Sequence, residues 1–325
     1  MENKGPGLAV LLSVLIALTW ITSILRFYVR YFILKAFWID DWLMAITLAS
    51  NTFWHIDQLI GIHYGVGRHM KDLTLPQIHT ALAMFWGSEL GYIATTTLLK
   101  LALGTLILRV AMDRTHILII RIVMVVSTVY GVAFFFVAMF QCHPISDFWN
   151  KLDTGNTCIA GRIISDLTYT HSAISVISDW ILVALPIQII MASYLDRRSK
   201  ILAVCTVAFG AIGSTATIVR IPVIKILDSS KADFLYTCVN LVVFSSVEGG
   251  VGLIAGNVVT LRPLFKSLSN LATSRSQGET KHTENRTSES RTVDVDVEDC
   301  SQKSLAPTEK HRENSTDTSV DVVDQ

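Results

Sequence analysis

The sequence predicts an all-α fold: a seven-transmembrane-helix bundle with its N-terminus outside and a disordered cytoplasmic C-terminal tail. Of the 325 residues, 51% are hydrophobic and 17% are charged, whereas a soluble domain has about a quarter charged residues. The charge is also uneven, with 19 Lys/Arg and 15 Asp/Glu in residues 1–265 but 8 and 12 in residues 266–325. We therefore predict two parts, a membrane domain over 1–265 and a polar, acidic, Ser/Thr-rich tail over 266–325.

Composition also excludes two classes of protein. A nucleic-acid-binding protein needs a basic face, and the net charge here is +0 at pH 7. A disulfide-dense secreted domain needs more than the five cysteines present. We therefore expect the lipid bilayer, and no nucleic acid, as a partner.

Seven stretches have the roughly 20 apolar residues that a helix needs to cross the hydrocarbon core of a bilayer. His55 and Asp57 dilute the second stretch, and Glu248 and several glycines dilute the seventh. In order, the predicted spans are residues 7–27, 42–62, 81–108, 117–140, 167–192, 201–223 and 234–260.

Lys and Arg in short loops set the orientation, because cytoplasmic loops carry an excess of them. Ten lie on the side that includes Arg26, Arg30 and Arg109, against seven on the other side. The N-terminus is therefore predicted outside. The tail has no aromatic residue and is dense in Ser, Thr, Asp and Glu, a composition typical of disorder.

Two cysteines share the longest outer loop, which faces an oxidising compartment. A disulfide between Cys142 and Cys158 would close a loop of about 15 residues, and it would stabilise the fold by roughly 3 kcal/mol in the chain-entropy model. We predict this bond. It would hold the loop, with Phe148 and Trp149, as a compact lid over the bundle.

Ionisable residues within the spans are costly, and they are therefore candidates for function. Lys100 lies about eight residues, roughly 12 Å, from the cytoplasmic end of the third span. Asp179 and Glu248 lie at similar depth, so a Lys100 pair with one of them is predicted. Helical spacing places the further candidate Glu89 on the Lys100 stripe, and Arg220 on a stripe of the sixth span. Such buried charged groups could bind a ligand and switch between two arrangements, or they could form a static network that only fixes the register of the helices.

Two specific chemistries receive little support. A retinal Schiff base needs a lysine in the seventh span, and residues 234–260 contain none. An intramembrane zinc hydrolase needs about three ligands with an open water position, yet no HExxH or paired-His helix motif occurs. We therefore expect no cofactor, no bound metal, no catalytic residue and no enzyme activity.

Several segments carry motifs found together, in this order, in one family. They are Arg26–Arg30, Asp40–Trp42, Tyr64–His69, Phe140–Cys142, Asp179–Trp180, Glu248 and Leu261–Phe265. With these segments the chain resembles the fungal rhodopsin-like integral membrane proteins, which include candidate G-protein-coupled receptors. The resemblance covers residues 5–266 and implies a seven-helix membrane domain with its N-terminus outside, but no known ligand. The animal-receptor acidic-Arg-Tyr triplet is replaced by Leu108-Arg109-Val110, so coupling to a G protein is only an analogy at the level of fold.

The leading hypothesis is a receptor-like sensor of an unknown small-molecule or surface ligand, located in the plasma membrane and not acting as a retinal photoreceptor. A transporter or channel that uses the intramembrane charges is the alternative. An intramembrane hydrolase is a weaker third hypothesis.

Overall fold

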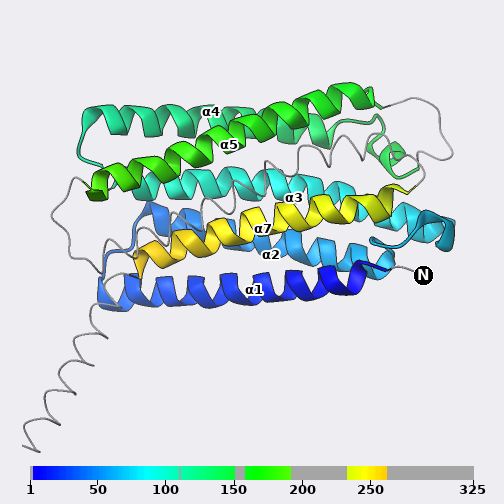
Figure 1. The fold of residues 1–325 in the computed structure, drawn as a ribbon, viewed down its shortest axis with the longest axis horizontal. Coiled ribbons are helices and arrows are strands. Elements are labelled where there is room, and N and C mark those ends of the chain that lie inside the picture. Colours follow the sequence, from blue (N-terminus) through cyan, green and yellow to red (C-terminus); the bar gives the residue numbers. More distant parts are fainter. Residues whose placement is uncertain (1–2, 110, 151–157, 192–232, 262–325) are drawn as a thin grey trace, which may run out of the picture. The chain divides into compact units, whose positions relative to one another are not determined.

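A computed structural model describes residues 3–109, 111–150, 158–191 and 233–261. Within these ranges the protein is helical, and extended backbone pairs only at an isolated bridge between Cys142 and Cys158. The long helices run side by side with their axes roughly aligned (Figure 1). They are α1 (Gly5–Tyr28), α2 (Ile39–Tyr64), α3 (Leu75–Leu108), α4 (Arg114–Met139), α5 (Gly161–Met191) and α7 (Phe234–Thr260).

The contacts between the helices place α3 at the centre of the described bundle. Helix α3 contacts α2, α4, α5 and α7, and α1 packs on both α2 and α7. Three short helical turns join the long helices. They are η1 (Val29–Ile33), a π-helical continuation of α1, and the 3-10 turns η2 (Met70–Asp72) and η3 (Ile145–Phe148).

The predicted helical class is confirmed, and the number of spans is confirmed in part. Four described helices are both long and apolar enough to cross a membrane, namely Gly5–Ile33, Leu75–Leu108, Arg114–Met139 and Phe234–Thr260. Helix α2 is long enough but contains His55 and Asp57, and α5 contains His171 and Asp179. The predicted sixth span, 201–223, and the tail, 266–325, lie outside the described residues.

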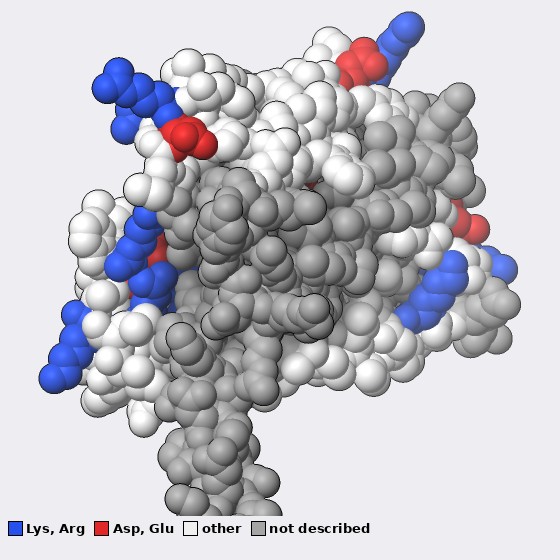
Figure 2. All heavy atoms as spheres, turned by 60° about the vertical axis from the view of Figure 1, so that its left-hand side comes forward, with Lys and Arg blue, Asp and Glu red and all other residues white. Residues whose placement is uncertain are grey.

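The surface agrees with a membrane location. Figure 2 shows one face of the molecule, with the Lys, Arg, Asp and Glu side chains mainly near its margins. The remaining described surface of this face is mostly uncharged. Large apolar side chains point outward from α1, α2 and α4, including Ile21 (60% exposed), Phe53 (75%) and Val125 (61%). Lipid tails are as apolar as these side chains, so their exposure is what a bilayer requires.

Local sequence explains where the helices begin and end. At the start of α3, the Gln77 side chain accepts hydrogen bonds from the backbone N–H and the hydroxyl of Thr74. Helix α2 stops at Gly65, whose φ of +122° suits a residue without a side chain. Between α1 and α2, Tyr31 and Trp38 are exposed, as in the aromatic belts found at membrane interfaces.

Candidate functional site

Lys100 lies inside the bundle and pairs with an acid, as predicted. Its Nζ donates to Asp179 Oδ1 and to the main-chain oxygen of Ser175, the latter at 3.3 Å. The side chains of Lys100 and Asp179 are 9% and 22% exposed. The pair joins α3 to α5 and gives each buried charge an opposite charge, which burial requires.

Glu248 joins the same arrangement from α7. The Tyr92 hydroxyl lies 3.0 Å from Glu248 Oε2 and 3.2 Å from Oε1, and the Ser175 hydroxyl lies 3.3 Å from Oε1. Ser175 therefore contacts Lys100 through its carbonyl and Glu248 through its hydroxyl. We call Tyr92, Lys100, Ser175, Asp179 and Glu248 the core network; it connects α3, α5 and α7.

His171 lies one helical turn before Ser175 on α5 and borders the core network. The imidazole is buried, and it stacks on Phe134 and Tyr130 with ring centroids 5.1 and 6.0 Å apart. The edge of the Tyr92 ring faces it at 6.1 Å. The sequence alone does not single out His171, because these aromatic neighbours come from α3 and α4.

Two charged candidates remain. Glu89 is partly buried and accepts a 3.5 Å hydrogen bond from the Gln141 amide, next to the loop that follows α4. Arg220 lies outside the described residues.

The outer loop contains the predicted disulfide between Cys142 and Cys158. The Ile159 N–H also donates to the Gln141 carbonyl at 2.8 Å. Phe148 is buried, and the Trp149 ring meets the Trp86 ring of α3 edge-on at 6.0 Å. The two predicted lid residues therefore pack toward the bundle.

A second buried ionic cluster lies at the opposite end of the bundle, which is predicted to face the cytoplasm. Arg26 Nε donates to Asp41 Oδ1 at 3.0 Å, and Arg26 Nη2 donates to Asp40 Oδ2 at 2.8 Å. Arg30 Nη2 lies 3.3 Å from Asp40 Oδ2, and Arg109 Nη1 lies 3.8 Å from Asp40 Oδ1. We call these five residues the inner clamp.

The inner clamp connects four helices. Arg26 extends from α1 to the start of α2, and its Nη1 donates to the main-chain oxygen of Gly256 in α7 at 3.0 Å. Arg109 caps the end of α3. Arg26 and Asp41 are both 0% exposed, so this cluster is as deeply buried as the apolar core.

Helix ends help the inner clamp to hold three arginines with only two aspartates. The α1–η1 segment, α3 and α7 end here, whereas α2 begins here. A helix C-terminus carries about −0.5 of an elementary charge, and an N-terminus carries about +0.5. The four ends together supply about −1, which offsets the one excess guanidinium.

Sequence reasoning missed the inner clamp, although its signal is present. Arg26 and Arg30 are spaced to share a helix face, and Asp40-Asp41 follows at the start of the next predicted span. The predicted first span, residues 7–27, contains Arg26 but ends before Arg30. The helix instead continues through Ile33 as η1.

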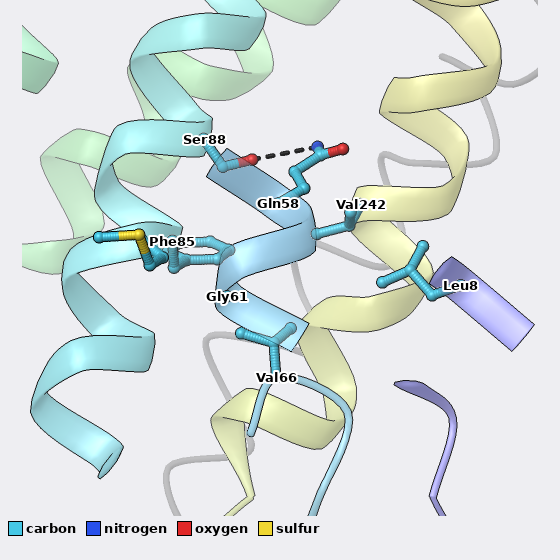
Figure 3. A pocket seen from close by; sticks show the side chains of 8 residues that line it. Leu8, Gln58, Gly61, Val66, Phe85, Ser88 and Val242 are labelled. Carbon is cyan, nitrogen blue, oxygen red and sulfur yellow. Dashed lines mark hydrogen bonds between the residues drawn. The ribbon is translucent and has the colours of Figure 1, made fainter. Parts of the chain in front are cut away.

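A small pocket opens between α1, α2, α3 and α7 at their outer ends (Figure 3). Its volume is about 10 Å³, near the lower limit for one water molecule. The Gln58 amide donates to the Ser88 hydroxyl at 3.1 Å, as Figure 3 shows. The lining residues are Leu8, Gln58, Gly61, Val66, Met84, Phe85, Ser88 and Val242.

Hydrogen bonds link this pocket to α7 and to the interior of the helix bundle. Ser246 donates to Gln58 Oε1, and Trp54 Nε1 donates to Ser88 Oγ, both at 3.1 Å. Among the residues that the structure describes, no group of three His, Cys, Asp or Glu side chains is arranged to hold a metal ion.

Comparison with known proteins places these residues in a family. The model of the fungal rhodopsin domain matches residues 25–267. The chain belongs to the fungal rhodopsin domain family.

Two relatives of this fungal rhodopsin domain are named proteins. The polyenoic acids biosynthesis gene cluster protein Ba17b of Metarhizium anisopliae is 26% identical over 280 residues, which are 82% of this chain and 76% of the relative. A SAT4 family membrane protein of Emericella nidulans is 25% identical over 237 residues, which are 70% of this chain and 59% of that protein. No solved structure matches.

The predicted family membership is thus confirmed. The matched range of the fungal rhodopsin domain begins just before Arg26 and ends after α7, so it contains the core network, the disulfide and the inner clamp.

Proposed function

We propose that this fungal rhodopsin domain protein is a receptor-like sensor of the plasma membrane. In this proposal, ligand binding changes the arrangement of the core network. The observation that supports the proposal is the position of Ser175, which contacts Lys100 with its carbonyl and Glu248 with its hydroxyl. A shift of α5 against α3 and α7 would alter both contacts together, so the network is suited to two alternative arrangements.

Ligand binding can be measured on the purified protein in lipid nanodiscs. Because one relative is named for a polyenoic acid gene cluster, a C18 polyunsaturated fatty acid is the first probe, followed by a library of small surface-derived molecules. A ligand present at 100 times its Kd should stabilise the protein by about 2.7 kcal/mol. Tryptophan emission should change as well, because Trp54 lies beside Tyr92 of the core network.

Variants separate ligand-induced switching from simple binding. Asp179→Asn should reduce the emission change, because it removes the charged partner of Lys100. Ser127→Ala is the matched control, since its 2.8 Å hydrogen bond to Ser178 also joins α5 to a neighbouring helix but lies outside the core network. Equal effects of the two variants, or no probe that stabilises the wild type, would count against a sensor that works through this network.

Transport is the second candidate, and one observation favours it. Three ionisable side chains, Glu248, Lys100 and Asp179, lie together across three helices, and Ser175 contacts both Glu248 and Lys100. Ionisable side chains inside a membrane domain relay protons in transporters. Proton flux into proteoliposomes that Glu248→Gln abolishes would support transport, whereas ligand-dependent emission changes without flux would support the sensor.

Two further elements complete the proposal. A retinal photoreceptor is not proposed, because α7 contains no lysine. Incubation with retinal should produce no new visible absorption band, and a light-sensitive band would contradict this. Coupling to a G protein is proposed by analogy at the level of fold alone, and nucleotide exchange on added G protein tests it.

A further inference from the structure

Helix α2 presents a buried polar stripe to the rest of the bundle. Thr47, Asn51, His55 and Gln58 follow one another at spacings of four, four and three residues, which places them on one helix face. Gln58 is 5% exposed, and the other three are 0% exposed. The stripe lies apart from the core network, and the proposed function does not use it.

Two members of this stripe have polar atoms without a hydrogen-bond partner among the described residues. Both Nδ2 and Oδ1 of Asn51 are unpaired, as is Nε2 of His55. His55 Nδ1 is satisfied, at 2.8 Å from the Asn51 carbonyl. Buried polar atoms nearly always have a partner, so three unpaired atoms within one helical turn indicate a bound molecule.

The residue of α7 that faces Asn51 has no side chain to supply that partner. Opposite Asn51, α7 carries Gly249, and a Cβ built there would be 4.0 Å from Asn51 Oδ1. The same Cβ would be 2.9 Å from the Trp54 ring, so a larger residue at Gly249 would collide with Trp54. Glycine leaves the Asn51 amide facing α7 without a side chain to bond.

The chemistry of the three unpaired atoms matches water. Nδ2 of Asn51 is a donor and Oδ1 is an acceptor, while the His55 nitrogen takes either role according to its tautomer. A cation would satisfy Oδ1 but would be repelled by the amide hydrogens. An apolar ligand would satisfy neither. Water both donates and accepts, and buried water typically makes two to four such bonds.

The outer pocket provides the entrance. Gln58 lines the pocket in Figure 3 and lies three residues after His55, about 4.5 Å along the helix axis. Asn51 lies seven residues from Gln58, about 10.5 Å along the axis. We propose that water enters through the outer pocket and is held, buried, at His55 and Asn51.

Radiolytic hydroxyl labelling of the protein in nanodiscs tests this proposal, because radicals form where water is held. Trp54 is the reporter, since its ring centroid is 4.9 Å from that of His55 although it is only 2% exposed. Ile120, which is 0% exposed in an apolar cluster, is the dry reference. After correction for intrinsic reactivity, Trp54 should label severalfold faster than Ile120.

The variants Asn51→Leu and Thr47→Val identify the group that holds the water. Asn51→Leu should bring Trp54 labelling down to the Ile120 level and lower the Tm. Thr47→Val should leave labelling unchanged, because the Thr47 hydroxyl already donates to the Leu43 carbonyl at 2.7 Å.

Three results would overturn the proposal. They are Trp54 labelling no faster than Ile120 in the wild type, labelling unaffected by Asn51→Leu, and a higher Tm in Asn51→Leu, which would mean that the amide has no partner at all. If Asn51→Leu does not fold, the wild-type comparison of Trp54 with Ile120 still decides.

Discussion

Replacing Arg26 by Met should strongly destabilise the bundle, because Arg26 is the centre of the inner clamp. The substitution removes the contacts at 2.8 and 3.0 Å to Asp40 and Asp41 and leaves both carboxylates buried. Removal of one partner of a buried ion pair costs about 3–5 kcal/mol. Arg30 remains 3.3 Å from Asp40 and 3.6 Å from Asp41, so we expect the lower end of that range.

A double-mutant cycle with Asp41→Asn isolates the pair. Alone, Asp41→Asn should cost about 2 kcal/mol, the value of a hydrogen bond to a charged group. Its amide oxygen can still accept the Trp38 N–H, which lies 3.2 Å from Asp41 Oδ2 in the wild type. In the double mutant both charges of the Arg26–Asp41 pair are absent, so neither remains buried without its partner. The combined cost should therefore be at least about 1 kcal/mol below the sum of the single costs.

Unfolding by SDS in mixed micelles, followed by tryptophan fluorescence, measures these differences. Arg114→Gln is the control, because Arg114 is exposed at the start of α4, and surface substitutions usually stay within about 0.5 kcal/mol. Additivity of Arg26→Met and Asp41→Asn within about 0.5 kcal/mol would refute the view that the clamp acts as a coupled unit.

Three further perturbations follow from the structure. Cys142→Ser removes the disulfide and should lower the free energy of unfolding by about 3 kcal/mol; a peptide map without reduction should show the linked pair in the wild type, and two alkylated cysteines would contradict it. Lys100→Met and Asp179→Asn should each destabilise the bundle, whereas their combination should recover part of the loss in SDS unfolding; strict additivity would assign Lys100 another partner. Gly91→Ala should cost about 1–3 kcal/mol by overpacking, because the added Cβ would be 2.8 Å from the Trp54 ring, and an unchanged unfolding midpoint would show that α2 and α3 can separate there.

The helices were predictable because their signal is composition over about 20 residues. The described helices α1, α2, α3, α4, α5 and α7 cover the corresponding predicted spans. Their ends were less predictable. The first span was predicted to end at residue 27, whereas α1 continues as the π-helical η1 through Ile33 and carries Arg30 with it.

The candidate site was predictable where charge and depth sufficed. Lys100, Asp179 and Glu248 are each costly in a membrane and lie at similar depth, so a pair of Lys100 with one of the two acids followed from the sequence, and the structure gives Asp179 as the partner. The roles of Ser175 and His171 did not follow, because both depend on which face of α5 meets α3 and α4. Asn51 was not singled out either, since its importance depends on the absence of a side chain at Gly249, which is distant in sequence but adjacent in the structure.

The arginines at the end of α1 are synthesised before their acidic partners in the inner clamp. Asp41 follows Arg26 by 15 residues, and at 5–20 residues per second it leaves the ribosome about 1–3 s later. During that interval the arginines at the end of α1 have no acidic partner, and such charges favour a cytoplasmic helix end. In the predicted orientation, the same guanidinium groups would first direct insertion of the chain and afterwards become buried in the finished bundle. A chain without Asp40 and Asp41 should still insert in the predicted orientation, and its arginines would then enter the interior without their acids.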